Sequence, residues 1–261
     1  MKNHSNKKIN LFLFQLCLFL LFPIQLFPQS KYEKKLSMSE WIAEMKNCKK
    51  NRYILENAEI YFDFYKDSLH SYTYYSSFQK GSKSQINKKH INTLIYIRNC
   101  KLPDNSSSVN HLVFHKNVTF AGCQGASQLI FNDCTFDQGI DLRSSELGLI
   151  QFENCSVLQR VVISELQARI LSFTNCILTT DKRNVRSVYS FGDENENRNY
   201  QYLFRVYQIQ NNIQTFFLSD CKFLPSNVIP VMLFSGGKYD FIGFDKINFT
   251  DIVKNHLIFD L

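Results

Sequence analysis

Apolar residues in the middle of the chain recur at a fixed interval of 21 positions. Three segments, LIFNDCTF, IQFENCSV and LSFTNCIL, repeat the same order of apolar, polar and cysteine residues between Leu129 and Leu178. Within each segment the apolar residues alternate with polar ones, skip one place, and then alternate again. Alternation is typical of β-strands, and the skipped place indicates a bend between two strands. The pattern therefore predicts short strands joined by tight bends.

A repeat of this length predicts a solenoid in which each repeat forms one coil. Twenty-one residues hold two or three short strands and leave no room for a crossover helix, and no Asn-Gly or Asp-Gly hairpin turn separates the copies. We therefore expect an all-β fold, a parallel β-helix, which is right-handed because crossovers in general are right-handed. The same template matches in whole or in part from Tyr53 to Leu261, which predicts eight to ten coils.

Equivalent residues of successive coils should lie above one another in columns. The bulky apolar positions form one inward column, and the cysteine positions form another, to which the template adds two outlying cysteines. A polar column falls at the bend, where Asn and Asp tolerate unusual backbone angles and can hydrogen-bond neighbouring amides. These structural columns comprise Phe131, Phe152 and Phe173; Cys100, Cys134, Cys155, Cys176 and Cys221; and Asp133, Asn154 and Asn175.

The five-residue step from Leu129-x-Phe131 to Cys134-x-Phe136, with its Asn-Cys and Asp-Cys doublets, resembles the pentapeptide-repeat and related right-handed β-helix proteins. The resemblance covers Tyr53–Phe249. The chain departs from that family in its 21-residue coil and in placing Asp or Asn before the small cysteine position. The resemblance implies a rigid binding or scaffold protein without assigned chemistry. It does not imply the family's mimicry of DNA by an acidic surface, because this chain has a net charge of +7.

Residues 1–30 differ in character from the rest of the chain. Three lysines precede an apolar run from Ile9 to Phe27, which Pro23 and two glutamines interrupt, and polar sequence follows. This order is the signature of a secretory signal peptide, so we expect a protein that is secreted or lies in the periplasm or cell envelope. An uncleaved leader that anchors the N-terminus in a membrane is the alternative. Cleavage near Ser30 would reduce the net charge from +7 to +4, which only weakly favours an anionic partner.

The chain contains eight cysteines, and one of them, Cys17, lies inside the leader. The seven that remain are an odd number, so they cannot all pair within one chain. Buried free cysteine commonly acts as a small apolar residue, and we expect free thiols in the core. A vertical disulfide between adjacent coils is the alternative, because stacking brings Cα atoms within its range. Intervals of 21 residues are not the spacing of a zinc site.

The segment 31–52 is predicted to cap the solenoid, which itself spans 53–261. Ser37 and Glu40 have the spacing of a helix capping box, and Trp41 begins the apolar face of the short helix that follows. Exposed strand edges at the end of a solenoid promote aggregation, and a helix there would protect them.

Two stretches within the solenoid, 61–92 and 181–213, do not fit the repeat and are predicted to be insertions. The first is rich in aromatic residues and then in lysines, and the second has a pattern that fits either a helix or a strand. Aromatic rings can stack on sugars or on unpaired bases, and an exported protein meets glycan rather than nucleic acid. Packing of the insertions on the solenoid wall is the alternative. The candidate partner-binding residues are Tyr61, Phe64, Tyr72, Tyr74, Tyr75, Tyr200, Tyr202 and Tyr207.

The chain contains no phosphate-binding loop, nucleophile elbow or zinc-protease motif, and we expect no cofactor, no metal and no catalytic residue. His111 and His115 share a strand face, but without a third ligand we interpret them as surface or bend residues. Asp141 and Arg143 match only loosely the carboxylate and basic side chains that polysaccharide-cleaving β-helix enzymes use. We therefore expect a non-enzymatic scaffold or binding protein that contacts a protein or glycan of the cell envelope. A polysaccharide lyase or hydrolase is the alternative, and membrane contact is expected only if the leader is retained.

Overall fold

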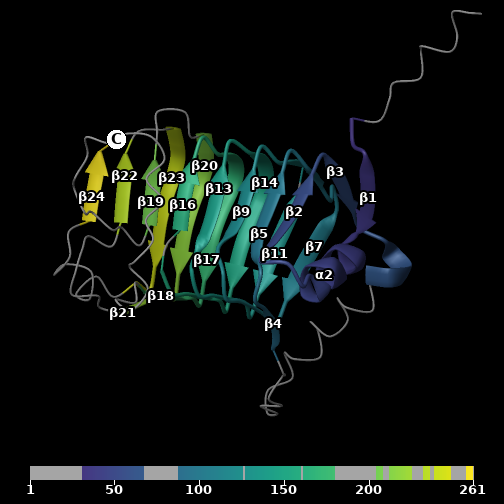
Figure 1. The fold of residues 1–261 in the computed structure, drawn as a ribbon. Helices are drawn as coiled ribbons and strands as arrows, with labels where there is room; N and C mark the ends of the chain where they lie inside the picture. Colours follow the sequence, from purple (N-terminus) through teal and green to yellow (C-terminus); the bar gives the residue numbers. More distant parts are fainter. Residues whose placement is uncertain are drawn as a thin grey trace, which may run out of the picture. The chain divides into compact units, whose positions relative to one another are not determined.

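The chain divides into two units, Met1–Glu33 and Lys34–Leu261, and the second contains every helix and strand described below. All pairings between the described strands are parallel (Figure 1). The predicted all-β parallel solenoid is therefore confirmed. The computed structural model describes residues 31–67, 88–125, 127–159, 161–179, 204–207, 212–224, 232–235, 238–247 and 257–260.

The strands form three sheets. Sheet A contains β1 (Lys34–Ser37), β3 (Ala58–Tyr61), β6 (Lys101–Leu102), β7 (Ser106–Asn110), β10 (Gln124–Gly125), β11 (Gln128–Asn132), β14 (Glu146–Glu153), β17 (Gln167–Thr174), β20 (Asn212–Ser219) and β23 (Lys238–Asp245). Sheet B contains β2 (Arg52–Glu56), β5 (Leu94–Arg98), β9 (Val118–Ala121), β13 (Ile140–Arg143), β16 (Val161–Ser164), β19 (Phe204–Tyr207), β22 (Met232–Ser235) and β24 (Leu257–Asp260). Sheet C contains β4 (Lys89–Ile91), β8 (Leu112–Phe114), β12 (Thr135–Phe136), β15 (Ser156–Val157), β18 (Ile177–Thr179) and β21 (Lys222–Leu224).

Within the described residues, six coils contribute to all three sheets in the order C, B, A. β4 begins the first of these coils and β23 ends the last, with partial coils before and after them. The number is smaller than the eight to ten predicted. The sequence template predicted too many coils because it also matched partial coils. It further matched two different bends of the same coil, one on each side of sheet A.

The phenylalanines of the repeat stack inside the coils. Phe131 pairs in register with Phe152, and Phe152 pairs with Phe173. Their ring centroids lie 5.1 and 4.5 Å apart, and the rings are within 10° of parallel. All three side chains are buried. Burying one such side chain contributes about 1.5–3 kcal/mol, so this column stabilises the coils that position the surface groups.

Two rows of bends, one on each side of sheet A, have left-handed backbone. The row between sheets A and C consists of His111, Asp133, Asn154, Asn175, Asp220 and Lys246, with φ from 50° to 55°. The row between sheets B and A consists of Asn57, Asn99, Gly122, Ser144 and Glu165, with φ from 44° to 64°. The polar column of the sequence repeat lies in the first row. Left-handed backbone costs a non-glycine residue about 1–2 kcal/mol. Asn and Asp adopt it more readily than other non-glycine residues, because their short side chains form local hydrogen bonds that offset part of this free energy.

The core cysteines occupy two columns instead of the single column predicted. Cys134, Cys155, Cys176 and Cys221 follow the bends between sheets A and C. Cys100 follows a bend between sheets B and A, where the amide of Gln124 donates to the Cys100 carbonyl at 3.0 Å and places Cys123 above it. The assignment of Cys100 to the column of Cys134 was wrong, because an Asn-Cys doublet occurs at both kinds of bend. All six of these thiols are buried and free, and the free thiol of Cys48 is partly exposed.

The predicted N-terminal helix is confirmed as α2 (Met38–Asn47). Its capping box is complete, since the Ser37 hydroxyl accepts the amide of Glu40 at 3.2 Å and the Glu40 carboxylate accepts the amide of Ser37 at 2.9 Å. Trp41 is buried and meets Phe120 edge-on, with ring centroids 6.5 Å apart. The helix therefore packs its apolar face into the same core as the coils.

The coil resumes inside both stretches that were predicted as insertions. β4 lies within 61–92 and pairs with β8, and β19 lies within 181–213 and pairs with β16. Residues 204–207 are therefore strand, which is one of the two forms that their pattern allowed. A short helical turn at 64–67 follows β3.

Candidate functional site

Exposed aromatic side chains occur where the chain leaves sheet A after β3. Of the predicted partner-binding residues, Tyr61 is 38% exposed and Phe64 is 72% exposed. Tyr65, which was not among the predicted residues, is 85% exposed, and its ring meets that of Phe64 edge-on at 6.0 Å. Residues 61–67 are referred to below as the cap segment, because their hydrogen bonds reach the capping helix.

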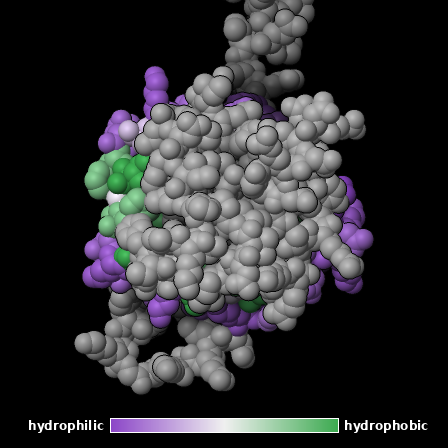
Figure 2. Space-filling view, turned by 90° about the vertical axis from the view of Figure 1, so that its left-hand side faces the viewer, coloured by the Kyte–Doolittle hydropathy of each residue, from purple (hydrophilic) through white to green (hydrophobic). Residues whose placement is uncertain are grey.

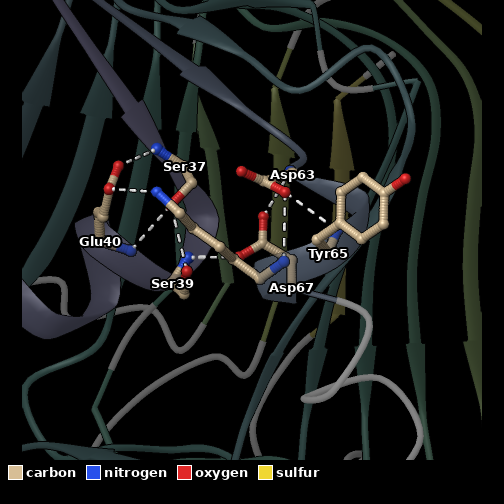
Figure 3. A network of polar contacts seen from close by, with 7 residues as sticks. Ser37, Ser39, Glu40, Asp63, Tyr65 and Asp67 are labelled. Atoms are coloured by element: carbon tan, nitrogen blue, oxygen red, sulfur yellow. Dashed lines mark hydrogen bonds and ion pairs between the residues drawn. The ribbon is translucent and has the colours of Figure 1, made fainter.

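A network of polar contacts holds the cap segment in place (Figure 3). The buried Asp67 carboxylate accepts the backbone amide of Asp63 at 2.7 Å and that of Ser39, on α2, at 2.9 Å. The Asp63 carboxylate accepts the amides of Tyr65 and Lys66 at 3.0 and 3.2 Å, which caps the short turn. The backbone is therefore fixed at both ends of the turn, while the Tyr65 ring points away from the network (Figure 3).

An ion pair adds a second link between the cap segment and the helix. Lys66 Nζ lies 2.8 Å from the Glu40 carboxylate. Hydrogen bonds from Lys66 and from Ser37 hold the pKa of Glu40 at about 2, below its usual value of 4.5. Both side chains are exposed, so solvent screens the pair and its main effect is to orient the segment.

Of the other predicted partner-binding residues, the structure describes the backbone of Tyr207. Tyr207 is the last residue of β19 and pairs with Ser164 and Ser235 on the neighbouring strands. The remaining predicted residues, Tyr72, Tyr74, Tyr75, Tyr200 and Tyr202, lie outside the described residues.

Histidines and aspartates form a second surface group, on sheet C and its two bends. His115 Nδ1 lies 2.6 Å from Asp137 Oδ2, and His111 Nδ1 lies 2.9 Å from Asp133 Oδ2. A third histidine, His90 on β4, has its Nδ1 2.8 Å from Nε2 of His115, and the two rings are nearly parallel with centroids 5.1 Å apart. These five residues are referred to below as the histidine–aspartate strip.

Strand register builds this strip, and sequence reasoning missed it. Each of the two histidine–aspartate pairs joins residues 22 positions apart, because the aspartate lies directly one coil beyond its histidine. His111 and His115 were interpreted as ordinary surface or bend residues. A signal was present, since two histidines four positions apart precede two aspartates four positions apart. The 21-residue template does not align these residues, because the coil from each histidine to its aspartate has 22 residues. The contact of His90 with His115 spans 25 residues and also falls outside the template.

An apolar patch lies on the outer face of sheet A near β23. Phe217 pairs in register with Gly243, and Ile170 lies in the same outward row as Phe241. The rings of Phe217 and Phe241 cover Gly243, where an added Cβ would collide with both of them. Phe241 is still 54% exposed. In the space-filling view of this end of the solenoid, apolar side chains gather on the left side (Figure 2).

Asp141 and Arg143 bind each other on β13. The Arg143 guanidinium donates from Nε to the Asp141 carboxylate at 2.7 Å, and this contact raises the pKa of Arg143. The register neighbours of Asp141, which are Thr119 and Val162, carry no carboxylate, so the two adjacent strands add no acid in register with the pair. Over the described ranges, no three His, Cys, Asp or Glu side chains are grouped so that they could hold a metal ion.

No known protein family, curated protein or solved structure matches this chain. In the part of the chain that the structure describes, no helix is both long and apolar enough to cross a membrane.

Proposed function

We propose that this protein is an exported, non-enzymatic scaffold or binding protein that contacts a protein or glycan of the cell envelope or extracellular space. Its side wall and its cap segment supply the contact surface. The observation that carries the proposal is that Phe64 and Tyr65 are largely exposed while Asp63 and Asp67 hold the backbone beneath them. Exposed apolar groups on an ordered segment of a rigid scaffold are a mark of interaction sites.

The energetics favour binding at this segment. A partner that covers the two rings removes apolar surface from water, at about 25 cal/mol for each Å². Because Asp67 already orders the segment through two backbone amides, binding does not have to order it, and less conformational entropy is lost. Aromatic faces suit the apolar face of a sugar ring, and the hydroxyl of Tyr65 adds a hydrogen-bonding group. These properties favour a glycan as the partner.

The family resemblance and the cellular location belong to the same proposal. Stacked phenylalanines and small buried cysteines on neighbouring inward columns support the likeness to pentapeptide-repeat proteins. Residues 1–30 act as a signal peptide that directs the protein to the envelope or out of the cell, with an N-terminal membrane anchor as the alternative. Mass spectrometry of the N-terminal residue of the protein from cells distinguishes these two forms.

Binding screens test the function. Purified protein is immobilised and exposed to a panel of glycans and to fractions of the cell envelope. We expect at least one to bind, and we expect the double variant F64A/Y65A to bind it about tenfold more weakly, since tenfold corresponds to about 1.4 kcal/mol.

Ile54→Ala is the matched control for this screen. Ile54 is 53% exposed on β2, in the wall but outside the cap segment, so its truncation should weaken binding less than the double variant does. The proposal fails if nothing in the panel binds, or if the control variant weakens binding as much as the double variant does.

One observation favours the alternative, a polysaccharide lyase or hydrolase. In the histidine–aspartate strip, Asp137 orients His115, which in turn orients His90. An imidazole supported in this way can serve as a general base. Assays for new reducing ends or unsaturated sugars on envelope polysaccharides test this alternative. Products that form with the wild type and disappear with His90→Gln would establish it, and a lack of products would eliminate it.

A further inference from the structure

The chemistry of the histidine–aspartate strip determines where its protons lie. An ionised carboxylate only accepts hydrogen bonds, so His115 donates from Nδ1 to Asp137. In a neutral imidazole the other nitrogen then accepts, so His90 donates from Nδ1 to Nε2 of His115. The one imidazole nitrogen of this hydrogen-bonded series that keeps a free lone pair is therefore Nε2 of His90, an exposed residue.

The hydrogen-bonded series of His90, His115 and Asp137 can take up one proton. When Nε2 of His90 is protonated, the proton between the two rings can shift from His90 to Nε2 of His115. The positive charge then lies beside the Asp137 carboxylate, 2.6 Å from His115. In either arrangement Nε2–H of His90 becomes a hydrogen-bond donor. Among the described residues this donor has no acceptor, so it is available to a ligand.

Both carboxylates of the strip already have cationic or donor partners. Asp133 accepts from His111 on one oxygen and pairs with Lys88, at 2.8 Å, on the other. Asp137 accepts from His115. An approaching anion therefore does not meet an unpaired acid in the strip.

Three described lysines lie close to the strip along the chain or on the adjacent helix. Lys89 and Lys116, the sequence neighbours of His90 and His115, make no ion pair with any described residue. The helix α2 packs against β4 and contributes Lys46, and its acids pair with lysines elsewhere. Burial, and then the ammonium group of Lys89, lower the pKa of Lys46 to about 8. This local excess of positive charge near the strip favours an anionic ligand.

We propose that His90 binds an acidic group of a glycan, either a carboxylate or a phosphate, and that binding takes up one proton into the histidine–aspartate strip. This inference rests on the proposed binding function and names the chemical class of the partner. Because the bound anion favours the protonated strip, affinity rises as the pH falls through the range where histidine titrates, about pH 8 to 5. One linked proton changes the binding constant by at most about tenfold for each pH unit.

Calorimetric titration of the full protein tests the inference. Polygalacturonate is the probe for a carboxylate, polyphosphate is the probe for a phosphate, and dextran is the uncharged comparison. Repeating the titration in buffers of different ionisation enthalpy measures proton uptake. We expect at least one anionic polymer to bind with net proton uptake somewhere between about pH 5 and 8, and we expect dextran to bind without uptake or not at all.

His90→Gln and a matched control locate the effect. Glutamine keeps a polar side chain but cannot present a protonated imidazole to the ligand, so this variant should reduce the uptake and bind about tenfold more weakly, as expected for one lost charge-assisted hydrogen bond. Ser156 faces outward in the same row of sheet C, three coils further along, so Ser156→Ala should behave like the wild type. Melting temperatures confirm that both variants fold.

Asp137→Asn tests whether the Asp137 carboxylate positions His115 and stabilises the protonated form of the two histidines. Asparagine keeps an acceptor oxygen but carries no charge, so the pH dependence of binding should shift to lower pH while the melting temperature changes little. A merely structural role of Asp137 would leave this pH profile unchanged.

The outcomes separate this inference from the proposed function. Binding of an anionic polymer without proton uptake, or with equal affinity to His90→Gln, overturns the inference. If only an uncharged glycan or a protein binds, and does so through the cap segment, the inference fails and the proposed function stands. If no partner binds at all, both fail.

Discussion

Asn175 donates its side-chain amide to the side-chain oxygen of Asn154, 2.7 Å away and one coil earlier in the same row of bends. Both residues have left-handed backbone, with φ of 51° and 54°. Asn154 in turn donates to the side chain of Asn132 at 3.0 Å. The same side chains that suit the bend therefore also connect one coil to the next.

Substitutions at Asn154 should separate these two effects. Alanine loses two hydrogen bonds and keeps the left-handed backbone, so the free energy of unfolding should fall by about 2–4 kcal/mol. Glycine loses the same hydrogen bonds but adopts positive φ readily, so its loss should be roughly half as large. Urea denaturation measures both variants. Equal stability of the alanine and glycine variants would show that the backbone angle at this bend has no cost.

The stacked phenylalanines should dominate the stability of the solenoid. Phe152 lies between Phe131 and Phe173 and is fully buried, so Phe152→Ala should lower the free energy of unfolding by about 3–5 kcal/mol. Phe241→Ala, on the exposed outer face of sheet A, provides the comparison and should change it by less than about 1 kcal/mol. A small effect at Phe152 would contradict the stacked core.

The contacts of Glu40 should make stability depend on pH in the acid range. Its folded-state pKa of about 2 is below the ordinary value of 4.5, because Lys66 and Ser37 hydrogen-bond the carboxylate. The stabilisation is therefore complete above pH 4.5 and is lost as the pH falls towards 2. The melting temperature of the wild type should exceed that of Glu40→Gln at neutral pH, and the difference should shrink over this interval. A constant difference would mean that the charge of Glu40 does not contribute.

Thiol reactivity should distinguish Cys48 from the core cysteines. Burial raises the pKa of the Cys123 thiol to about 12 and that of Cys155 as well, so these thiols stay protonated and shielded at neutral pH. In a Cys17→Ser background, a thiol reagent should modify one residue of the native protein, Cys48, and should modify the six buried thiols only after unfolding. Adding Cys48→Ala should abolish the native-state reaction. Rapid modification of several thiols in the native state would contradict the buried columns.

The repeat and the N-terminal cap were predictable because their signals are local. Phe131, Phe152 and Phe173 lie one coil apart at a constant interval, so counting along the chain is equivalent to moving from coil to coil. Ser37 and Glu40 contact each other within a single helical turn. In both cases the residues that meet in space have a fixed separation in sequence.

The predictions were less successful where coil length varies or where two bends resemble each other. Cys100 was assigned to the wrong column because Asn99-Cys100 and Asn154-Cys155 are the same doublet at different bends. The contact between His90 and His115 depends on the pairing of β4 with β8 and has no period in the sequence. The apolar patch has no signal in the repeat, because Phe217 and Gly243 meet only through the register of β20 with β23.

By itself, the amino-acid order determined that this chain forms short strands, left-handed bends and a coil with phenylalanines and cysteines inside. Side-chain alternation and bend chemistry act over a few residues, so they can be read without knowing the fold. Only the tertiary structure decided which surface groups meet, such as His90 with His115 and Asp67 with Ser39. Those contacts depend on the register between coils, which is set by the combined packing of the core and not by any one segment.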